Sequence, residues 1–296
     1  MHIPDGFLSM PVWAAMDAVS APAVGYAVRK AQSGFDDAKV PLLGVMGAFV
    51  FAAQMINFPV GVGTSGHLVG GALLACTLGP AAASVVMCAI LAIQALVFQD
   101  GGILALGTNV FNMAIAGVLA GYLPYYFWGR GPRRRAAIFA GGVFSLLTSA
   151  ILALAELLIS GVRMPGSVLG VSLALFVVSA LVEGAITVAV VAALERIQPN
   201  LMRSPSAGRS PALAALALVA VLLAAGGVLF ASTAPDGIER LAIQTGIASH
   251  AHSLISGPLK DYQAAWLGSG WPAQAGAGIA GLGLVYGVCL IIGRKR

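Results

Sequence analysis

The sequence predicts an all-α integral membrane protein, a bundle of about seven helices followed by a two-helix C-terminal unit. Of its 296 residues, 59% are hydrophobic and only 9% are charged, whereas soluble domains carry about 25% charged residues. Apolar runs of about 20 residues recur, and each is long enough to cross a bilayer core of roughly 30 Å. A polar stretch rich in Pro, Ser and Arg, residues 195–211, separates the last two runs from the others.

Nine apolar segments are predicted to be helical. Prolines stand near four of the predicted helix starts, where a missing N–H costs little. The third segment is short for a full crossing, so we expect a partial or tilted helix that ends at the turn Gly79-Pro80. The predicted segments are 12–30, 40–58, 67–79, 80–98, 108–128, 136–160, 167–194, 211–231 and 273–292.

The distribution of basic residues predicts the orientation. Loops on the cytoplasmic side of a membrane carry an excess of Lys and Arg. Only Arg163, Arg240 and Lys260 fall in loops on the side of the N-terminus, which we therefore expect outside, with the C-terminus inside. The basic residues behind the net charge of +5 thus serve to orient the chain and do not indicate a nucleic-acid partner. The other basic residues are Arg29, Lys30, Lys39, Arg130, Arg133, Arg134, Arg135, Arg196, Arg203, Arg209, Arg294, Lys295 and Arg296.

Two domains are expected. Residues 1–200 form a block of seven segments, and residues 201–296 form a two-span tail with an external loop of about 40 residues, 232–272. The stretch 195–211 has the composition of a linker between them. No convincing internal repeat is present, which argues against an inverted-repeat transporter.

The first two residues predict a metal site. The Met1 amine, the His2 amide and the His2 imidazole lie in succession, and chelation through them closes one five-membered and one six-membered ring. The imidazole of His67 would complete a plane of four nitrogens, a geometry that suits Ni(II) or Cu(II). The chain start lacks the basic and apolar regions of a secretory signal, so we expect Met1 to be retained.

Residues near these ligands have two interpretations each. His67, in the glycine-rich run GTSGHLVGG, is either a ligand or a helix-start histidine satisfied by main-chain carbonyls. Ser65 or Thr64 could cap that helix, or orient the imidazole as a second layer around the metal. Asp100 is a candidate for the same supporting role. Asn109 either contacts the metal site or caps the helix that follows it.

Other polar residues offer alternatives. Asp5 is expected to shape the terminal segment rather than to bind metal. His250 and His252 form an HxH pair in the external loop of the tail, which could gather metal or simply be solvated. Carboxylates inside membrane spans are functional candidates, and a stand-alone secondary cation carrier would use them as relays. These carboxylates are Asp17, Glu156 and Glu183, of which Asp17 and Glu156 could instead lie near a span end or bond to neighbouring helices in a structural role.

Enzyme chemistry is not indicated. No GxxxxGK[ST] phosphate loop, GxSxG or HExxH motif occurs, so ATP hydrolysis is expected in a separate chain. Cys76, Cys88 and Cys289 lie in apolar runs without CxxC spacing, which favours buried core thiols over a disulfide framework.

Three segments carry a family resemblance: MHIPDGFLS, GTSGHLVGGALLACTLGP and FQDGGILALGTNVFNMAIAG. They resemble the NikM/CbiM family, the substrate-capture (S) components of energy-coupling-factor transporters for nickel and cobalt. The resemblance covers roughly residues 1–200. The tail is similar to the small NikN/CbiN-type partner, with PDGIER at 235–240 where that group has a PDGLE-like motif.

The resemblance implies a seven-helix, S-component-like main domain whose metal is held through Met1, His2 and His67. The transported substrate would be Ni(II), with Co(II) as the alternative, because GTSGHL is closer to the nickel-type loop; no organic cofactor is implied. It also implies a transmembrane coupling subunit and cytoplasmic ATPase subunits as partners. The expected location is the bacterial cell (inner) membrane.

Overall fold

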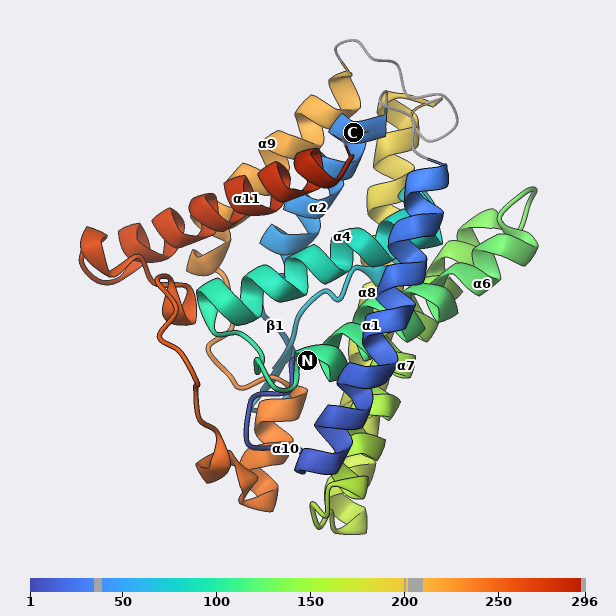
Figure 1. The fold of residues 1–296 in the computed structure, drawn as a ribbon. Helices are drawn as coiled ribbons and strands as arrows, with labels where there is room; N and C mark the ends of the chain where they lie inside the picture. Colours follow the sequence, from blue (N-terminus) through green and yellow to red (C-terminus); the bar gives the residue numbers. More distant parts are fainter. Residues whose placement is uncertain (35–38, 200, 202–209, 294–296) are drawn as a thin grey trace.

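The computed structural model describes residues 1–34, 39–199, 201 and 210–293, which are mainly helical (Figure 1). Below, "head" means residues 1–199 and "tail" means residues 210–293. The head contains α1 Met10–Ser33, α2 Val40–Gln54, β1 Phe58–Gly61, β2 Thr64–Gly66, α3 Gly71–Leu78, α4 Pro80–Ile93, the π-helical turn η2 Gln94–Phe98, α5 Leu106–Asn109, the π-helical η3 Val110–Gly117, α6 Val118–Trp128, α7 Arg134–Ile159 and α8 Gly166–Ile197. The tail contains α9 Pro211–Gly226, α10 Gly237–Thr245, α11 Trp271–Gly293 and the 3₁₀ turns η4 Gly227–Leu229, η5 Ile247–His250, η6 Lys260–Tyr262 and η7 Ala265–Leu267.

Several helices can cross a membrane, so the prediction of an all-α membrane protein is confirmed. Helix α2 is apolar but has only 15 residues, and α3 has 8, which fits the expected partial third helix. Helix α1 has 24 residues and contains Pro22, but it is less apolar and is not among the stretches that qualify. Within the described residues, six stretches are long and apolar enough: Pro80–Phe98, Leu106–Trp128, Arg134–Ile159, Gly166–Ile197, Pro211–Leu229 and Trp271–Gly293.

Three local features differ from the sequence prediction. Residues 58–66, predicted as a loop, form the antiparallel hairpin β1–β2, with Gly63 at a positive φ of 64° in its turn. Helix α3 begins at Gly71 rather than at His67, because residues 67–70 are not helical and their main chain is bound elsewhere, with Gly70 at a positive φ of 81°. The long loop of the tail, predicted without a helix, contains helix α10, which starts at a capping box made by Asp236 and Glu239.

Glycines bring the helices of the head close together. A Cβ on Gly142 would lie 2.6 Å from the Cα of Gly184, so α7 and α8 touch main chain to main chain. A Cβ on Gly121 of α6 would lie 2.9 Å from the Cβ of Ala72 on α3. Lipid provides no hydrophobic driving force between helices, so close packing of this kind is a main source of helix association.

The tail packs on the head along α2 (Figure 1). Helices α9 and α11 both contact α2, and α11 also contacts α4. A Cβ on Gly281 of α11 would lie 2.3 Å from the ring of Phe51, and a Cβ on Gly47 of α2 would lie 3.1 Å from the Sγ of Cys289. The two parts of the chain therefore share one apolar core.

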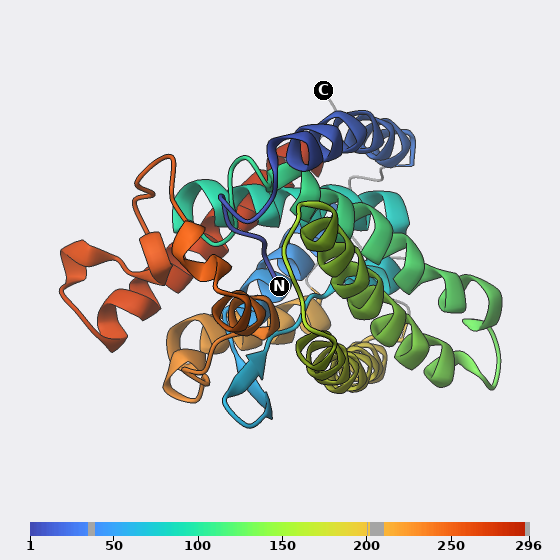
Figure 2. The same cartoon turned by 90° about the horizontal axis from the view of Figure 1, so that it is seen from below.

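The N-terminus lies inside this assembly. Figure 2, seen from the end that carries α10, places it near the middle of the molecule, among the hairpin, α10 and α1. The start of α1 and helix α10 lie toward the lower end in Figure 1, whereas the C-terminus lies at the upper end. Five basic residues counted for the orientation fall outside the described residues: Arg203, Arg209, Arg294, Lys295 and Arg296.

Candidate metal centre

The first residues of the chain are buried. Met1 and His2 are each 7% exposed, and Ile3 is fully buried. A charged terminus is costly to bury unless it is paired and hydrogen-bonded. The terminal segment is therefore expected to meet specific polar partners inside the protein, and it does.

Main-chain hydrogen bonds hold this segment. The Ile3 N–H donates to the Asn109 side chain at 2.9 Å, and the Asn109 amide donates back to the Ile3 carbonyl at 3.0 Å. The Gly102 N–H also donates to the Ile3 carbonyl, at 2.9 Å. Asn109 lies inside the helical stretch that begins at Leu106, so it positions the segment and does not cap that helix.

Asp5 fixes the other end of the segment. Its carboxylate accepts the N–H groups of Ile103, Leu104 and Ala105 at 2.9, 2.8 and 3.2 Å. These N–H groups precede α5, so Asp5 satisfies donors at a helix start. The expectation that Asp5 shapes the terminal segment agrees with these contacts.

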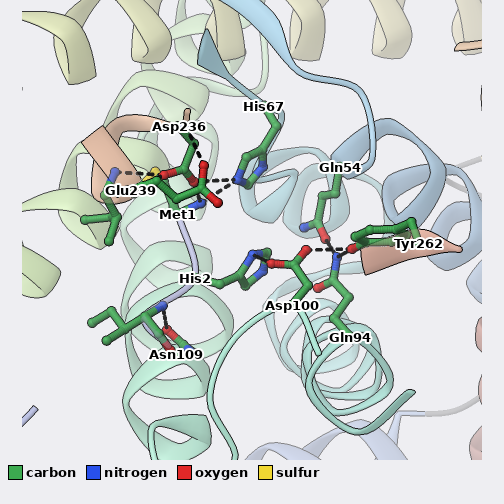
Figure 3. A network of polar contacts seen from close by, with 12 residues as sticks. Met1, His2, Gln54, His67, Gln94, Asp100, Asn109, Asp236, Glu239 and Tyr262 are labelled. Atoms are coloured by element: carbon green, nitrogen blue, oxygen red, sulfur yellow. Dashed lines mark hydrogen bonds and ion pairs between the residues drawn. The ribbon is translucent and has the colours of Figure 1, made fainter. Parts of the chain in front are cut away.

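Figure 3 shows how the terminal amine and His67 meet. The nitrogen of the Met1 amine lies 2.5 Å from Nε2 of His67. The rings of His2 and His67 stack, with centroids 5.6 Å apart and planes at 5°. Nδ1 of His67 lies 3.0 Å from the Leu68 carbonyl, which leaves Nε2 facing the amine. The three residues predicted from the sequence are therefore brought together.

Helix α8 holds His67 in place through the main chain. The carboxylate of Glu183 accepts the N–H groups of Val69 and Gly70 at 2.7 and 2.8 Å. Both groups lie within three residues of His67, in the non-helical stretch before α3. Ser65 takes a different role from the one considered, because its hydroxyl donates to the Ala234 carbonyl of the tail at 2.7 Å.

Asp100 contacts the ring of His2. Its Oδ1 is 2.9 Å from His2 Nδ1, and its Oδ2 accepts the hydroxyl of Tyr262 at 2.6 Å. Nε2 of His2 is buried and has no partner. The side-chain amide of Gln94 donates to the hydroxyl of Tyr262 at 3.2 Å, so a polar chain runs from His2 to the tail (Figure 3).

A second tail residue enters the site, and the sequence reasoning missed it. Oδ2 of Asp236 lies 2.5 Å from the Met1 nitrogen and 3.6 Å from His67 Nε2. Its other oxygen, Oδ1, accepts the N–H groups of Ile238 and Glu239 as the cap of α10. PDGIER was noted as a motif, but no local signal shows that its aspartate reaches the chain's first residue.

Electrostatics favour a neutral imidazole beside charged carboxylates. Burial lowers the pKa of His67, and the ammonium of Met1 lowers it further. Burial alone would raise the pKa of Asp236, but that ammonium and His67 hold it well below its ordinary value. Burial alone would also raise the pKa of Asp100, but His2 and the hydroxyl of Tyr262 hold that pKa below its ordinary value.

The carboxylates inside the helices all have protein partners. Asp17 accepts the Gly107 N–H at 2.9 Å, and Glu156 accepts from the Asn112 amide at 2.7 Å. Glu183 binds the stretch after His67, as described above. These contacts agree with structural roles. His250 and His252 are exposed, and Nδ1 of His252 lies 3.1 Å from the His250 carbonyl.

The candidate donors are nitrogens rather than a cluster of metal-binding side chains. Among residues that the structure describes, no three His, Cys, Asp or Glu side chains form a group that could hold a metal. The predicted set needs only two imidazoles, because amine and amide supply the other donors. Two donors each bound at about 2 Å to one metal in a square plane lie about 2.8 Å apart. The 2.5 Å between the Met1 nitrogen and His67 Nε2 is close to that spacing.

These features define a multi-pass membrane protein with a buried terminal amine facing two imidazoles. The family model described as "Cobalt uptake substrate-specific transmembrane region", CbiM, matches residues 2–201, and the PDGLE domain model matches residues 210–295. The chain belongs to the CbiM family of transition-metal transport proteins and carries a PDGLE domain at its C-terminal end.

Relatives share both parts. A putative fused nickel transport protein, NikMN of Archaeoglobus fulgidus, is 37% identical over 95% of this chain and 93% of its own length. A probable fused nickel transport protein, LarMN of Lactiplantibacillus plantarum, is 30% identical over 85% of this chain and 83% of its own. A crystal structure of a truncated transition metal transporter is 35% identical, with a TM-score of 0.59, and covers 66% of this chain and 99% of that one.

Proposed function

We propose that this chain captures Ni(II), or alternatively Co(II), at the outer face of the membrane, as the metal-binding subunit of an ATP-driven energy-coupling-factor importer. The observation that carries the proposal is the buried meeting of the Met1 amine with Nε2 of His67, 2.5 Å apart across 66 residues of sequence. The names of the relatives NikMN and LarMN support nickel, and the description of the family model supports cobalt uptake.

Planar coordination by four nitrogens favours nickel over cobalt. Its donors are the Met1 amine, the His2 amide, His2 Nδ1 and His67 Nε2. Copper would bind such a set more tightly than nickel by intrinsic affinity. The supply of metals around the cell therefore shares in the selectivity.

Loading requires His2 to turn. The six-membered chelate ring through the His2 amide closes only at Nδ1, which contacts Asp100, whereas Nε2 has no partner. A half-turn of the ring about the Cβ–Cγ bond moves Nδ1 to the position of Cδ2 and Nε2 to the position of Cε1, which lies next to the former position of Nδ1. Nδ1 then becomes available to the metal, and Nε2 can donate to Asp100, as metal-bound histidines commonly do with a carboxylate.

Acid is expected to weaken binding. The donors must lose protons before they coordinate, so protons and metal compete for the site. We expect nickel affinity to fall steadily as the pH is lowered from 8 to 6, measured by calorimetry on the purified protein. An affinity that is independent of pH over this range would contradict coordination by the amine and the amide.

The proposed orientation puts the metal site on the outside of the cell (inner) membrane, with the N-terminus outside and the C-terminus inside. The charge bias supports it, because Arg133, Arg134 and Arg135 fall on the opposite side from the site. Arg134 pairs with Glu195 at 2.6 Å, whereas Arg133 and Arg135 are exposed. These two exposed side chains are available to the coupling subunit or to anionic lipid.

The partners supply the energy in this proposal. A transmembrane coupling subunit and cytoplasmic ATPase subunits would drive release of the metal to the inside. Nickel uptake by cells that express the chain with and without these subunits tests the dependence. Uptake of equal rate in both cells would favour a stand-alone carrier instead.

The terminal amine gives the sharpest test of the binding site. Extending the chain by Gly-Ser-Gly-Ser before Met1 removes the amine from the site and leaves every side chain unchanged, so we expect tight nickel binding to be lost. A single added residue is unsuitable, because it would make histidine the third residue and create another four-nitrogen chelate independent of His67.

His67→Ala is the companion variant, and it is expected to lose nickel with the amine intact. Metal content and thermal unfolding of the metal-free proteins are measured together, so that loss of binding is separated from loss of fold. Full nickel retention by both variants would overturn the proposed site and favour a site built on the carboxylates of the helices.

A further inference from the structure

Asp236 brings a negative charge from the tail into the candidate metal centre. Its Oδ2 lies 2.5 Å from the Met1 nitrogen and 3.6 Å from Nε2 of His67, and the residue is 8% exposed. Capping of α10 uses only Oδ1, which accepts two N–H groups. The second oxygen is therefore not needed by the helix and faces the cargo donors.

The position of this carboxylate is fixed by contacts between the tail and the hairpin. The Ser65 N–H donates to the Pro235 carbonyl at 2.9 Å, and the Ser65 hydroxyl donates to the Ala234 carbonyl at 2.7 Å. The Arg240 guanidinium donates to the Val62 carbonyl and to the Thr64 hydroxyl. Because β2 leads directly into His67, Asp236 and His67 are held as one unit.

A charge count shows what this carboxylate does before and after loading. Without metal, the ammonium carries one positive charge next to the carboxylate. A divalent ion bound by a neutral amine, one deprotonated amide and two neutral imidazoles also carries one net positive charge. Asp236 can therefore balance the site in both states, and an unbalanced buried charge is costly.

Other charged groups do not take this place. Asp100 lies against His2 and the hydroxyl of Tyr262, to the right of His2 in Figure 3, whereas Asp236 lies to the left of His67. The carboxylate of Glu239 accepts the Asp236 N–H at 2.9 Å and thereby closes the capping box. Within the described residues, Asp236 is the carboxylate that contacts both the terminal amine and His67.

We propose that Asp236 of the tail is the counter-charge of the cargo site, so that the tail completes the site and holds the loaded divalent ion in place. The inference rests on the proposed function, since it takes Met1, His2 and His67 as the ligands. It assigns to the PDGLE domain a direct part in retaining the cargo.

The test is the rate at which bound nickel leaves the full-length protein. The purified protein with a free N-terminus is loaded with one nickel ion and then mixed with an excess of chelator. Asp236→Asn removes the charge while keeping a side chain that caps helices well. We expect nickel to dissociate at least tenfold faster from Asp236→Asn than from the unchanged protein.

Two control variants separate charge from fold. Asp261→Asn makes the same chemical change at an exposed position of the same loop, and should leave the rate unchanged. Glu239→Gln weakens the capping box but keeps the Asp236 carboxylate, and should change the rate less than threefold. Where Asp236→Asn does not fold, Asp236→Ser repeats the test with another favourable cap.

The outcomes are distinct. An unchanged or slower dissociation from Asp236→Asn overturns the inference, and a slower rate would mean that Asp236 competes with the cargo. If Glu239→Gln speeds nickel dissociation as much as Asp236→Asn does, the effect is due to the fold of α10, and the inference is again overturned. If the unchanged protein binds no nickel, or His67→Ala keeps it, the proposed function itself fails.

Discussion

Gly102 shows how closely the terminal segment fits its surroundings. A Cβ at this position would lie 2.2 Å from Oδ1 of Asp5 and 2.4 Å from the Asp5 nitrogen. The Gly102 N–H also donates to the Ile3 carbonyl. A residue without a side chain is therefore needed where the loop before α5 meets the terminal segment.

Substituting Gly102 by alanine should weaken metal binding without touching a ligand. The added methyl group displaces Asp5, which loosens the segment that carries His2. We expect the dissociation constant for nickel to rise at least about tenfold, or roughly 1.4 kcal/mol, measured by titration calorimetry. Gly166→Ala is the control, because a Cβ there meets no atom within 4 Å. Equal affinity of the two variants would show that the segment does not need this close contact.

At the scale of elements, α8 carries a carboxylate that organises a stretch far away in sequence. Glu183 is fully buried and accepts the N–H groups of Val69 and Gly70. These contacts explain why residues 67–70 are not helical and why α3 begins only at Gly71. A buried N–H group left without an acceptor costs about 1–3 kcal/mol, so this carboxylate has a structural role that a cation relay would not require.

Glu183→Gln should destabilise the protein. The amide offers one acceptor oxygen, and its NH₂ group faces a main-chain donor, so one N–H loses its partner. We expect about 1–3 kcal/mol lower stability, seen as a lower midpoint of thermal unfolding in detergent. Glu195→Gln on the same helix removes a partly exposed ion pair with Arg134 and should cost at most about 1 kcal/mol. An unfolding midpoint for Glu183→Gln equal to that of the unchanged protein would refute the structural role.

At the scale of the whole molecule, the candidate metal centre depends on how the tail is docked. Tail residues Asp236 and Tyr262 reach the site from two sides, while α11 packs along α2. A Cβ on Gly281 would meet the rings of Phe51 and Phe98 at 2.3 and 2.6 Å. Bulk at this position should push α11 away from the head.

Gly281→Leu should therefore expose Cys289, which is fully buried on α11 and lies against Gly47. We expect a maleimide to label Cys289 faster in this variant than in the unchanged protein, with the labelled residue located by mass spectrometry. Gly283→Leu is the matched control on the same helix, since a Cβ there meets no atom within 4 Å. Equal labelling of the two variants would show that α11 does not depend on this contact.

The sequence by itself determined the membrane class, the helical segments and the residues that meet at the centre. Apolar runs of spanning length have few alternatives to a helix in lipid, because every main-chain polar group must be satisfied within the segment. The residues Met1, His2 and His67 were identified because their chemistry is unusual in an apolar chain, although their role as ligands remains a proposal.

Only the tertiary structure decided the contacts between distant segments. The hairpin 58–66 was missed because its two short strands are rich in Gly and Pro, and its pairing is stabilised by the tail. The contact between Asp236 and Met1 spans 235 residues, so no local pattern can show it. A pairing at such a separation is set by the packing of whole helices, which brings the cap of α10 to the buried start of the chain.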